Sequence, residues 1–362
     1  MKTVFFFLYD LKIGGTEKVV IYLANYLANQ NLQVNILTVS DHNDLKILID
    51  PKISLFSLNK TSLKSSIIPL YSFVRNNNVD VLISNVWPLT VISSFIRIVS
   101  NKTKLIFIDH CNLSEEFKNK GQIFKKLQQI SIYFLYKLAH SVVAVSKGVK
   151  NDLIDKGVAK DKITVIYNPL HSSNEVIIKP HINLNNWFDT KQKKIISVGE
   201  FKKQKNFINL IEAINIFYDS YDLQPQVLIL GDGSERPNME AKINLHNLND
   251  VFSLPGWVDD PIPFLKKSDL FVLSSDFEGF GVVIAEALSE GINVVSTNCP
   301  SGPSEILLNG KLGYLCKVND PLDLAKSIYK GLTAPINSKP LIKRSKDFSI
   351  EKIGKKYLEI IL

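Results

Sequence analysis

The sequence has few cysteines, no long apolar run and no metal-ligand pattern, and each absence excludes a class of protein. Its 362 residues contain three cysteines, an odd number without the spacing of a zinc site, which is typical of a reducing compartment. No apolar stretch reaches the roughly 18 residues that a membrane-spanning helix needs. Neither a Ser-His-Asp order nor a Cys-His order stands out, so no nucleophile-and-base site is predicted.

The fingerprint of dinucleotide binding is also missing. No GxGxxG follows the first predicted strand, and Gly231-Asp232-Gly233 offers only the first half of that motif. No acidic residue is placed to bind a ribose in the Rossmann manner, which weakens the case for a dinucleotide cofactor.

The N-terminal segment MKTVFFFLYD imitates a signal peptide. Asp10 and Lys12 end its apolar run early, and no small-residue cleavage site follows. We therefore interpret this segment as the first buried strand of a cytoplasmic protein.

The excess of positive over negative charge lies entirely in the first half of the chain. The net charge is +8, and residues 1–170 hold 21 Lys and Arg against 12 Asp and Glu, whereas residues 171–362 hold 22 against 23. An anionic partner is expected for the first half. Nucleic acid is one candidate, but no aromatic-and-basic repeat or zinc module supports it. An anionic membrane surface is the other, because each Lys or Arg near such a surface contributes about 1 kcal/mol.

One segment of this basic half mixes lysines with apolar side chains. Residues 121–140 (GQIFKKLQQISIYFLYKLAH) have the composition of an interfacial helix. A core helix with a lysine edge would have the same composition, so both interpretations stay open.

Apolar runs alternate with candidate helices and predict two open α/β domains. The first domain contains seven such runs, at residues 4–9, 34–39, 53–58, 81–84, 105–108, 142–145 and 163–167. The second contains six, at residues 195–198, 227–230, 251–254, 270–273, 294–296 and 314–318. The predicted boundaries are residues 1–170, a polar linker at 171–192, residues 193–345, and an amphipathic terminal helix at 346–362.

The stretch 270–298 has the order strand, loop, helix, strand, and ligands of such units gather at the carboxyl ends of the strands. Glu278 and Glu286 would lie about 80° apart on one continuous helix, so we expect Glu278 in the loop and Glu286 in the helix. Gly279 and Gly281 let backbone N–H groups approach an anion closely. The pattern suits a phosphate held by backbone and hydroxyls held by carboxylates. The alternative is one glutamate near a helix cap and one facing solvent.

Three more loops carry candidate residues, each with a structural alternative. Gly14 and Gly15 precede a helix and suit an anion or sugar contact, or only a tight turn. His110 follows a strand and either faces a cleft or is structural. A strand-to-helix turn carries Lys202, Lys203 and Lys205, which suit a diphosphate or form a solvated basic turn.

Taken together, these segments resemble the retaining GT-B glycosyltransferases of family four, which build bacterial lipopolysaccharide, capsule and lipid-linked glycans. The resemblance spans nearly the whole chain. Its ordered motifs are GGTE (14–17), DH (109–110), AHSVVAVSKGV (139–149), ITVIYNP (163–169), VGEFKKQKN (198–206), ILGDGSER (229–236), PGWVDD (255–260), FEGFGVVIAEALSEG (277–291) and CPSGPSEILLNG (299–310). It implies two Rossmann-like, doubly wound parallel-sheet domains that face each other across a cleft, with the C-terminal helix returning to the first domain.

The resemblance also implies roles for individual residues. Glu278 matches the glutamate beside the donor sugar, and Glu286 matches the one that holds the nucleotide ribose. Lys205 matches the lysine that offsets the diphosphate charge. The remaining matches are Phe280 and Gly281, whose backbone N–H groups would face the sugar and diphosphate; Gly15, with Gly14, near the β-phosphate; His110 near the transferred sugar; and Trp257 and Val258 along the base.

One position departs from the family pattern. The family usually has an arginine after the glycine of VGR, and this chain has Glu200. An acid cannot bind phosphate, so Lys202 or Lys203 would have to replace that contact.

The implied reaction transfers a hexose or N-acetylhexosamine from a UDP-sugar to an acceptor hydroxyl, with retention at the anomeric carbon. No metal and no other cofactor is expected, because a lysine and helix N-termini can stabilise the leaving diphosphate. The acceptor would be a lipid-linked or soluble glycan, with undecaprenyl diphosphate as the suggested carrier. The enzyme would be peripheral at the inner face of the cell membrane. The alternatives are a UDP-N-acetylglucosamine 2-epimerase-like enzyme on the same fold and a non-catalytic sugar-nucleotide-binding partner.

Overall fold

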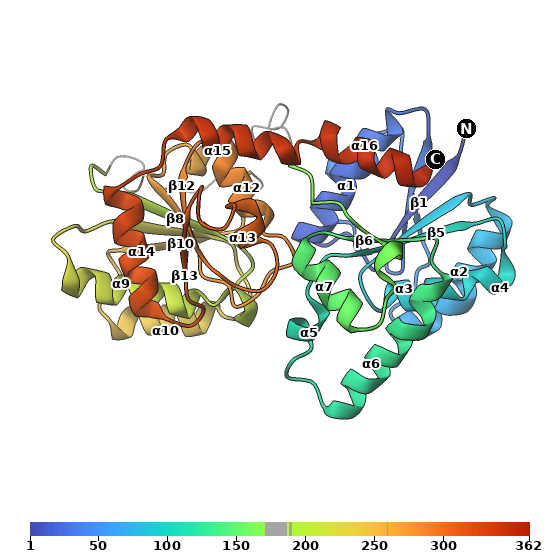
Figure 1. The fold of residues 1–362 in the computed structure, drawn as a ribbon, viewed down its shortest axis with the longest axis horizontal. Helices are drawn as coiled ribbons and strands as arrows, with labels where there is room; N and C mark the ends of the chain where they lie inside the picture. The colour runs from blue at the N-terminus through green and yellow to red at the C-terminus, as the bar shows by residue number, and fades with distance from the viewer. Residues whose placement is uncertain (171–186, 188–189, 259) are drawn as a thin grey trace. The chain divides into compact units, whose positions relative to one another are not determined.

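The computed structural model describes residues 1–170, 187, 190–258 and 260–362. Contacts divide the chain into two compact units, Met1–His171 with Phe348–Leu362, and Ser172–Asp347. Each unit is built on one parallel sheet with its own helices (Figure 1). Most of the predicted linker at 171–192 lies outside the described residues.

The first unit contains a seven-stranded sheet in the order β3-β2-β1-β4-β5-β6-β7, and neighbouring strands are parallel. Its strands are β1 (Thr3–Leu8), β2 (Gln33–Thr38), β3 (Ser54–Ser57), β4 (Val81–Asn85), β5 (Lys104–Asp109), β6 (Ser141–Ala144) and β7 (Ile163–Val165). The central strands are buried along almost their whole length, as expected for a parallel sheet covered on both faces. The direction of strand addition reverses between β1 and β4.

Eight α-helices accompany this sheet within the described residues. They are α1 (Gly15–Ala28), α2 (Leu63–Asn76), α3 (Leu89–Ser94), α4 (Ile96–Val99), α5 (Leu113–Glu116), α6 (Gln122–Leu135), α7 (Lys147–Asp155) and α16 (Ile350–Ile361). The C-terminal helix α16 packs on α1, and a Cβ added at Gly354 would lie 2.2 Å from the Tyr26 ring. Lys2 Nζ donates to the carbonyls of Ile361 (3.2 Å) and Leu362 (2.9 Å), so the two chain ends meet in the first unit.

The second unit contains a six-stranded parallel sheet in the order β10-β9-β8-β11-β12-β13. Its strands are β8 (Lys194–Val198), β9 (Gln226–Leu230), β10 (Phe252–Gly256), β11 (Leu270–Leu273), β12 (Asn293–Thr297) and β13 (Tyr314–Cys316). Its helices are α9 (Phe207–Ser220), α10 (Arg236–Leu245), α11 (Ile262–Leu265), α12 (Val282–Ser289), α13 (Pro303–Ile306), α14 (Pro321–Thr333) and α15 (Ser338–Ser345). Here the direction of strand addition reverses between β8 and β11.

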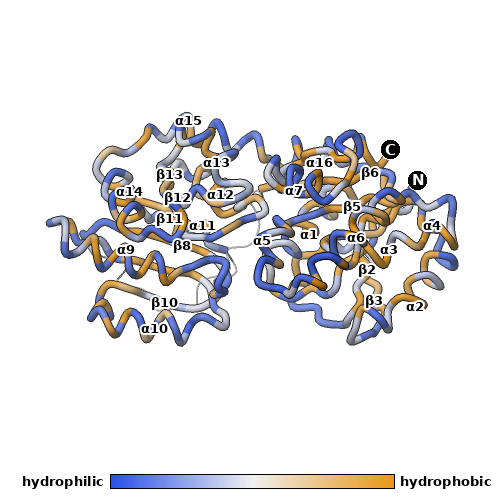
Figure 2. The backbone as a smooth tube through the Cα atoms, turned by 60° about the horizontal axis from the view of Figure 1, so that its bottom comes forward, coloured by the Kyte–Doolittle hydropathy of each residue, from blue (hydrophilic) through white to orange (hydrophobic). Residues whose placement is uncertain are grey.

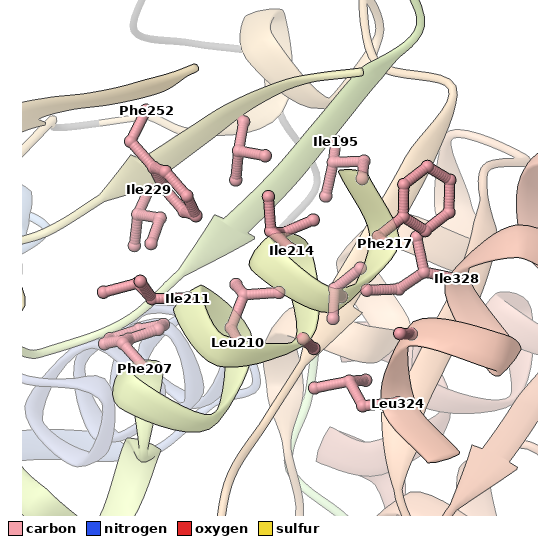
Figure 3. Packing of buried hydrophobic residues seen from close by; sticks show 14 of the residues in the cluster. Ile195, Phe207, Leu210, Ile211, Ile214, Phe217, Ile229, Phe252, Leu324 and Ile328 are labelled. Atoms are coloured by element: carbon pink, nitrogen blue, oxygen red, sulfur yellow. The ribbon is translucent and has the colours of Figure 1, made fainter. Parts of the chain in front are cut away.

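The core of the second unit lies between this sheet and helices α9 and α14, which pack side by side (Figure 1). Phe217 on α9 and Ile328 on α14 are fully buried there, together with Ile195 of β8 (Figure 3). Along α9 and α10, hydrophobic and hydrophilic positions alternate as in amphipathic helices (Figure 2). Apolar burial on one helix face therefore fixes these helices against the sheet.

The predicted doubly wound α/β fold is confirmed, and all thirteen predicted strands are present. The differences lie at the element ends. The first helix begins at Gly15 rather than at Lys18, and β7 ends at Val165 rather than at Tyr167. Ile166 and Tyr167 continue the apolar run after β7 has stopped pairing with β6. Hydropathy alone therefore places the end of this strand too late.

Removing the Phe217 ring should destabilise the second unit. Phe217→Ala leaves a cavity in a core without solvent access, and we expect a loss of about 3–5 kcal/mol in the free energy of unfolding. Urea unfolding followed by fluorescence measures it. Leu245→Ala, at a side chain that is 69% exposed, is the control and should change stability by less than about 0.5 kcal/mol. Equal effects of the two changes would contradict this assignment of the core.

Candidate functional site

Two loops at the carboxyl edge of the second sheet form the centre of the site. Residues 199–206 follow β8, and residues 274–281 follow β11. Because strand addition changes direction between these two strands, their loops lie where ligands of open α/β sheets usually bind.

An ion pair joins the two loops. Lys205 Nζ lies 2.6 Å from Glu278 Oε1, and the two side chains are only 15% and 7% exposed. The Ser275 hydroxyl donates to the same carboxylate oxygen at 2.6 Å. Charge-assisted hydrogen bonds of this kind are roughly twice as strong as neutral ones, so the carboxylate is held in one position. The structure thus brings together two residues that are 73 positions apart in the sequence.

Further hydrogen bonds fix the backbone around this pair. Gln204 Nε2 donates to the Phe277 carbonyl at 2.7 Å, and the Asp276 N–H donates to the Gln204 carbonyl at 2.8 Å. Asn206, in the left-handed region at φ 44°, donates from Nδ2 to Asp276 at 2.7 Å. Sequence reasoning missed the supporting roles of Ser275 and Gln204; their only signal was a polar side chain in a loop that follows a strand.

Helix α12 begins directly after the second loop. Its N-cap residue, Gly281, has φ 88°, a conformation that favours glycine, and no side chain caps the helix. The first backbone N–H groups of α12 therefore suit an anion. Glu278 lies in the loop and Glu286 lies inside α12, as the spacing predicts. The roles of both toward a ligand stay predictions.

The loop after β12 packs on the same segment. A Cβ added at Gly302 would lie 2.0 Å from the Phe280 carbonyl oxygen, so only glycine permits this approach. Phe280 itself is buried. The loop that carries Gly302 thus packs directly against the backbone of Phe280, which is expected to face the sugar and the diphosphate.

The loops after β9 and β10 complete this edge of the sheet. The Gly231 N–H donates to the Gly256 carbonyl at 2.8 Å, and a Cβ at Gly231 would lie 1.9 Å from the Gly199 carbonyl oxygen. Gly231 therefore serves the close packing of three loops. Trp257 follows β10 with 42% of its surface exposed, and Val258 beside it is half-buried.

The three lysines of the β8 loop have different surroundings. Lys205 pairs with Glu278, whereas Lys202 Nζ lies 3.5 Å from Glu200 Oε2 on the surface. Lys203 is exposed and lines a cavity of about 230 Å³ together with Asn206. The exposed Lys202–Glu200 pair contributes little to stability, so Lys202 can turn toward another anion at small cost.

In the first unit, His110 follows β5 next to the point where strand addition reverses. Its Nε2 lies 3.0 Å from Asn85 Oδ1, and Asn85 donates from Nδ2 to the Phe7 carbonyl at 3.3 Å. His110 is 8% exposed, and burial lowers its pKa to about 4, so the imidazole is neutral at pH 7. Its Nδ1 is buried and has no hydrogen-bond partner among the described residues.

The double glycine lies at the same edge of the first sheet, after β1. Gly14 is the N-cap of α1, and no side chain caps that helix. A Cβ added at Gly15 would meet nothing within 4 Å, so the backbone there borders open space. The first turn of α1 already carries an acid, because a Cβ added at Gly14 would lie 2.1 Å from Glu17 Oε2. An anion at this helix N-terminus would share it with the Glu17 carboxylate, and the phosphate contact of Gly14 and Gly15 stays a prediction.

Asp109 lies next to His110 in the sequence and is fully buried. Tyr136 donates its hydroxyl to Asp109 Oδ1 at 3.1 Å, while Oδ2 has no partner among the described residues. Burial raises the pKa of Asp109 to about 7. The two neighbours thus carry pKa values shifted in opposite directions by the same desolvation.

Within the described ranges, no group of three or more His, Cys, Asp or Glu side chains is placed to hold a metal ion. A metal-independent reaction stays a prediction. No helix among the described residues is both long and apolar enough to cross a bilayer.

Two family models match adjacent parts of the chain. Residues 13–173 match the model described as Glycosyltransferase Family 4, and residues 182–348 match the one described as Glycosyl transferases group 1.

Two proteins of Campylobacter jejuni are similar over nearly their whole length. One is named N-acetylgalactosamine-N,N'-diacetylbacillosaminyl-diphospho-undecaprenol 4-alpha-N-acetylgalactosaminyltransferase; it is 27% identical, and the match covers 98% of each chain. The other is named GalNAc-alpha-(1->4)-GalNAc-alpha-(1->3)-diNAcBac-PP-undecaprenol alpha-1,4-N-acetyl-D-galactosaminyltransferase; it is 24% identical, and the match covers 100% of this chain and 98% of the relative.

The fold is similar to that of Anabaena HepE, which was solved in complex with UDP and glucose. The TM-score is 0.81 at 19% identity, over 100% of this chain and 99% of HepE. A structure of HepE in complex with UDP-glucose gives the same TM-score.

The opposite pKa shifts of Asp109 and His110 predict a pH signature. Asp109 contributes stability that is present below its unfolded value of 3.8 and is lost as the pH rises through about 7. His110 destabilises the fold at low pH, because the unfolded chain binds a proton on this imidazole below pH 6.5 and the folded chain only below about 4. This cost disappears as the pH rises from about 4 to 6.5. Between about pH 4 and 6.5, the contributions of Asp109 and His110 to the free energy of unfolding therefore change with pH in opposite directions.

Substituting either Asp109 or His110 should therefore show the pH dependence that the other residue gives to the free energy of unfolding. In Asp109→Asn, the free energy of unfolding should rise with pH between about 4 and 6.5 more steeply than in the wild type. In His110→Gln it should fall with pH more steeply than in the wild type. Urea unfolding at a series of pH values measures both, and parallel profiles for all three proteins would contradict the burial of these groups.

Proposed function

The chain belongs to the GT-B glycosyltransferases of the family 4 type, and from this we propose that it transfers a hexose or N-acetylhexosamine from a UDP-sugar to a glycan hydroxyl with retention. The observation that carries the proposal is the Lys205–Glu278 pair, at the strand reversal and in front of the uncapped helix α12. A cation, free N–H groups and a carboxylate are the groups that a nucleotide sugar requires.

In this proposal, each group acts on one part of the donor. The Lys205 ammonium and the first N–H groups of α12 stabilise the negative charge that grows on the departing diphosphate. Glu278 accepts hydrogen bonds from hydroxyls of the sugar, and Glu286 accepts them from the ribose. In the protein without donor, Glu278 neutralises Lys205 and keeps this cation in place.

The proposed chemical step conserves the anomeric configuration. The acceptor oxygen forms a bond to the anomeric carbon on the face from which the diphosphate leaves, while the bond between that carbon and the phosphate oxygen breaks. The proton of the acceptor hydroxyl passes to the departing phosphate oxygen, and UDP is released. His110, with a neutral imidazole at pH 7, can hydrogen-bond to the transferred sugar without adding a charge.

Uracil as the base of the donor nucleotide is supported by the fold and by one exposed side chain. HepE, which has the same fold, was crystallised with UDP and with UDP-glucose. In this chain Trp257 offers an exposed aromatic face at the end of β10, next to the loops of the proposed diphosphate site. An aromatic face and a base pack well on each other.

A lipid-linked acceptor is supported by the names of the two Campylobacter relatives, both of which include undecaprenol. We extend this to the present chain and propose an acceptor carried on undecaprenyl diphosphate at the cytoplasmic membrane surface. Bacterial surface polysaccharide or glycoprotein glycan assembly would be the setting. A soluble glycan acceptor is the alternative that the acceptor experiment below tests.

The surface of α6 suits such a location. Ile123, Leu127, Ile130 and Phe134 follow one another at helical spacing and are 79%, 61%, 44% and 59% exposed. Lysines at positions 118, 120, 125, 126 and 137 lie within α6 or close to its ends in the sequence. An apolar stripe flanked by lysines is the pattern of a helix that lies in the interface of an anionic bilayer.

Radiolabelled transfer from a panel of UDP-sugars tests the reaction directly. We expect label in an undecaprenyl-diphosphate-linked glycan and in no product when the acceptor is omitted. A changed sugar nucleotide without acceptor would support the epimerase-like alternative. Binding of UDP without any turnover would support the non-catalytic partner, and label only in water-soluble glycans would contradict the lipid-linked acceptor.

Substitutions of the ion pair should separate donor binding from turnover. Lys205→Gln should weaken UDP binding about tenfold or more, because a hydrogen bond between charged groups is lost. Glu278→Gln should keep UDP binding and lower kcat at least about a hundredfold, since a contact to the reacting sugar changes. The rise in melting temperature with UDP and the rate of transfer measure the two effects. Lys311→Gln, at an exposed lysine of the same unit, is the control; a similar loss there would contradict the assignment.

Charge on the α6 stripe should release the protein from membranes. Leu127→Glu with Phe134→Glu should lower binding to phosphatidylglycerol vesicles about tenfold or more, because apolar contact is lost and repulsion is added. Cosedimentation measures the bound fraction. Leu245→Glu, which changes an exposed leucine of the second unit, is the matched control and should bind as the wild type does. If the α6 variant binds the vesicles as well as the wild type does, the α6 stripe is not the membrane contact.

A further inference from the structure

A group of basic side chains lies at the amino edge of the first sheet, where its strands begin. Lys104 is the first residue of β5, His140 directly precedes β6, and Lys162 directly precedes β7. Arg97 of α4 joins them, with its Nη1 3.2 Å from His140 Nε2. Because β5, β6 and β7 are parallel, this edge is opposite to the carboxyl edge that carries His110.

The imidazole of His140 lies between two hydrogen-bond donors. The Leu105 N–H donates to Nδ1 at 2.9 Å, so a neutral ring carries its proton on Nε2. The Arg97 guanidinium can only donate, and it lies beside that same Nε2. Among the described residues, Arg97 has no other side-chain hydrogen bond. Two donors thus lie side by side at an exposed residue, and an acceptor that binds there would satisfy both.

Positive charge gathers around this ring. Burial, followed by the charges of Arg97, Lys104 and Lys162, lowers the pKa of His140 below its usual 6.5, so the imidazole is neutral at pH 7. Burial and the charge of Lys2 lower the pKa of Lys104. All the charged groups that act on these two side chains are cations, so an anion at this edge would be attracted by each of them.

Within the described ranges, Arg97, Lys104 and Lys162 form no ion pair with a carboxylate. Lys162 Nζ donates instead to the carbonyls of residues 137 (2.5 Å) and 139 (3.0 Å), which holds its charge in place. Asp80, which precedes β4 on the same edge, accepts a hydrogen bond from the Thr3 N–H at 2.8 Å. The protein therefore leaves the charge of these three cations for another anion.

A phosphate group matches the two donors. Its oxygens only accept, so neighbouring oxygens can take the Nε2–H of His140 and the planar guanidinium of Arg97 together. Apolar side chains border this guanidinium in the sequence: Phe95, Ile98 and Val99 are 38%, 78% and 41% exposed. Exposed apolar residues next to a phosphate site favour a phosphate that is carried by a lipid.

We propose that Arg97 and the Nε2–H of His140 bind a phosphate group at the amino edge of the first sheet, with Lys104 and Lys162 adding positive charge. The headgroup of an anionic phospholipid is the favoured source of this phosphate, and free phosphate shares its chemistry. The inference extends the proposed membrane location to a defined headgroup site, and it does not depend on the transfer reaction.

NMR of the imidazole nitrogens of His140 tests the site directly. In the protein without ligand, the ring should be the neutral Nε2–H tautomer at pH 7. Inorganic phosphate should shift the Nε2 signal, and Arg97→Gln should weaken this binding about tenfold or more, because a hydrogen bond between charged groups is lost. Arg75→Gln removes the same charge from an exposed position of α2 and should leave phosphate binding unchanged. Phosphate bound by the loops of the second unit does not enter this local signal.

Vesicles distinguish the two sources of phosphate. Arg97→Gln with His140→Asn should lower binding to phosphatidylglycerol vesicles about tenfold or more, as measured by cosedimentation. The asparagine keeps an acceptor for the Leu105 N–H and removes only the Nε2–H, so β5 retains its hydrogen bond. Arg75→Gln is the control and should lower vesicle binding by at most about fivefold, which is the effect of one charge near an anionic surface.

The remaining outcomes decide the inference. A shift of the His140 signal with inorganic phosphate, without an effect of the double variant on vesicle binding, would identify free phosphate as the ligand of the site. A ring signal that does not respond to phosphate, an Nδ1–H tautomer, or equal losses in Arg97→Gln and Arg75→Gln would refute the site.

Failure of the proposed function would look different. UDP should raise the melting temperature of all these variants as it does that of the wild type, because the proposed donor groups lie in the second unit. If UDP does not stabilise even the wild type while phosphate still shifts the His140 signal, the donor assignment falls and the phosphate site stands.

Discussion

The structure of the candidate site depends on one ion pair buried at the reversal of a parallel sheet. Lys205 and Glu278 come from the loops that follow the neighbouring strands β8 and β11, and their contact holds these loops together. A buried charge without a partner would be costly, so each residue requires the other when no ligand is present. A donor with a diphosphate offers Lys205 a second anion. In the proposed reaction, the same ion pair that holds the loops together would also position the Lys205 ammonium for the donor.

The two units use one construction principle for different tasks. In both, the direction of strand addition reverses in the middle of the sheet, and polar side chains collect at that carboxyl edge. The second unit has a charged pair and an uncapped helix there, which suits a nucleotide diphosphate. The first unit has the neutral His110 at this edge, which suits a hydroxyl group, and the open backbone at Gly15.

Much of the fold follows directly from the sequence, because strands that are covered on both faces must be continuously apolar. That requirement places the central strands, whereas the edge strands, such as β3 (Ser54–Ser57), are only partly buried and carry weaker apolar runs. The polar residues at the carboxyl ends of the strands mark the loops that carry Glu278, Lys205 and His110. The spacing of Glu278 and Glu286 likewise assigns one to a loop and the other to a helix. Local chemistry is sufficient for these conclusions, since each depends on residues that are close together in the chain.

Contacts between distant segments were decided only by the tertiary structure. No local pattern indicates that Lys205 meets Glu278 while Lys202 meets Glu200, because the partner depends on how two loops pack. The exposure of the α6 stripe could not be separated from burial by hydropathy, since a core helix has the same composition. Arg97 and His140, which are 43 positions apart, likewise meet without any local signal. The sequence by itself determined which elements form, because their periodicity is local, and the folded chain decided which side chains meet, because that requires segments far apart to pack together.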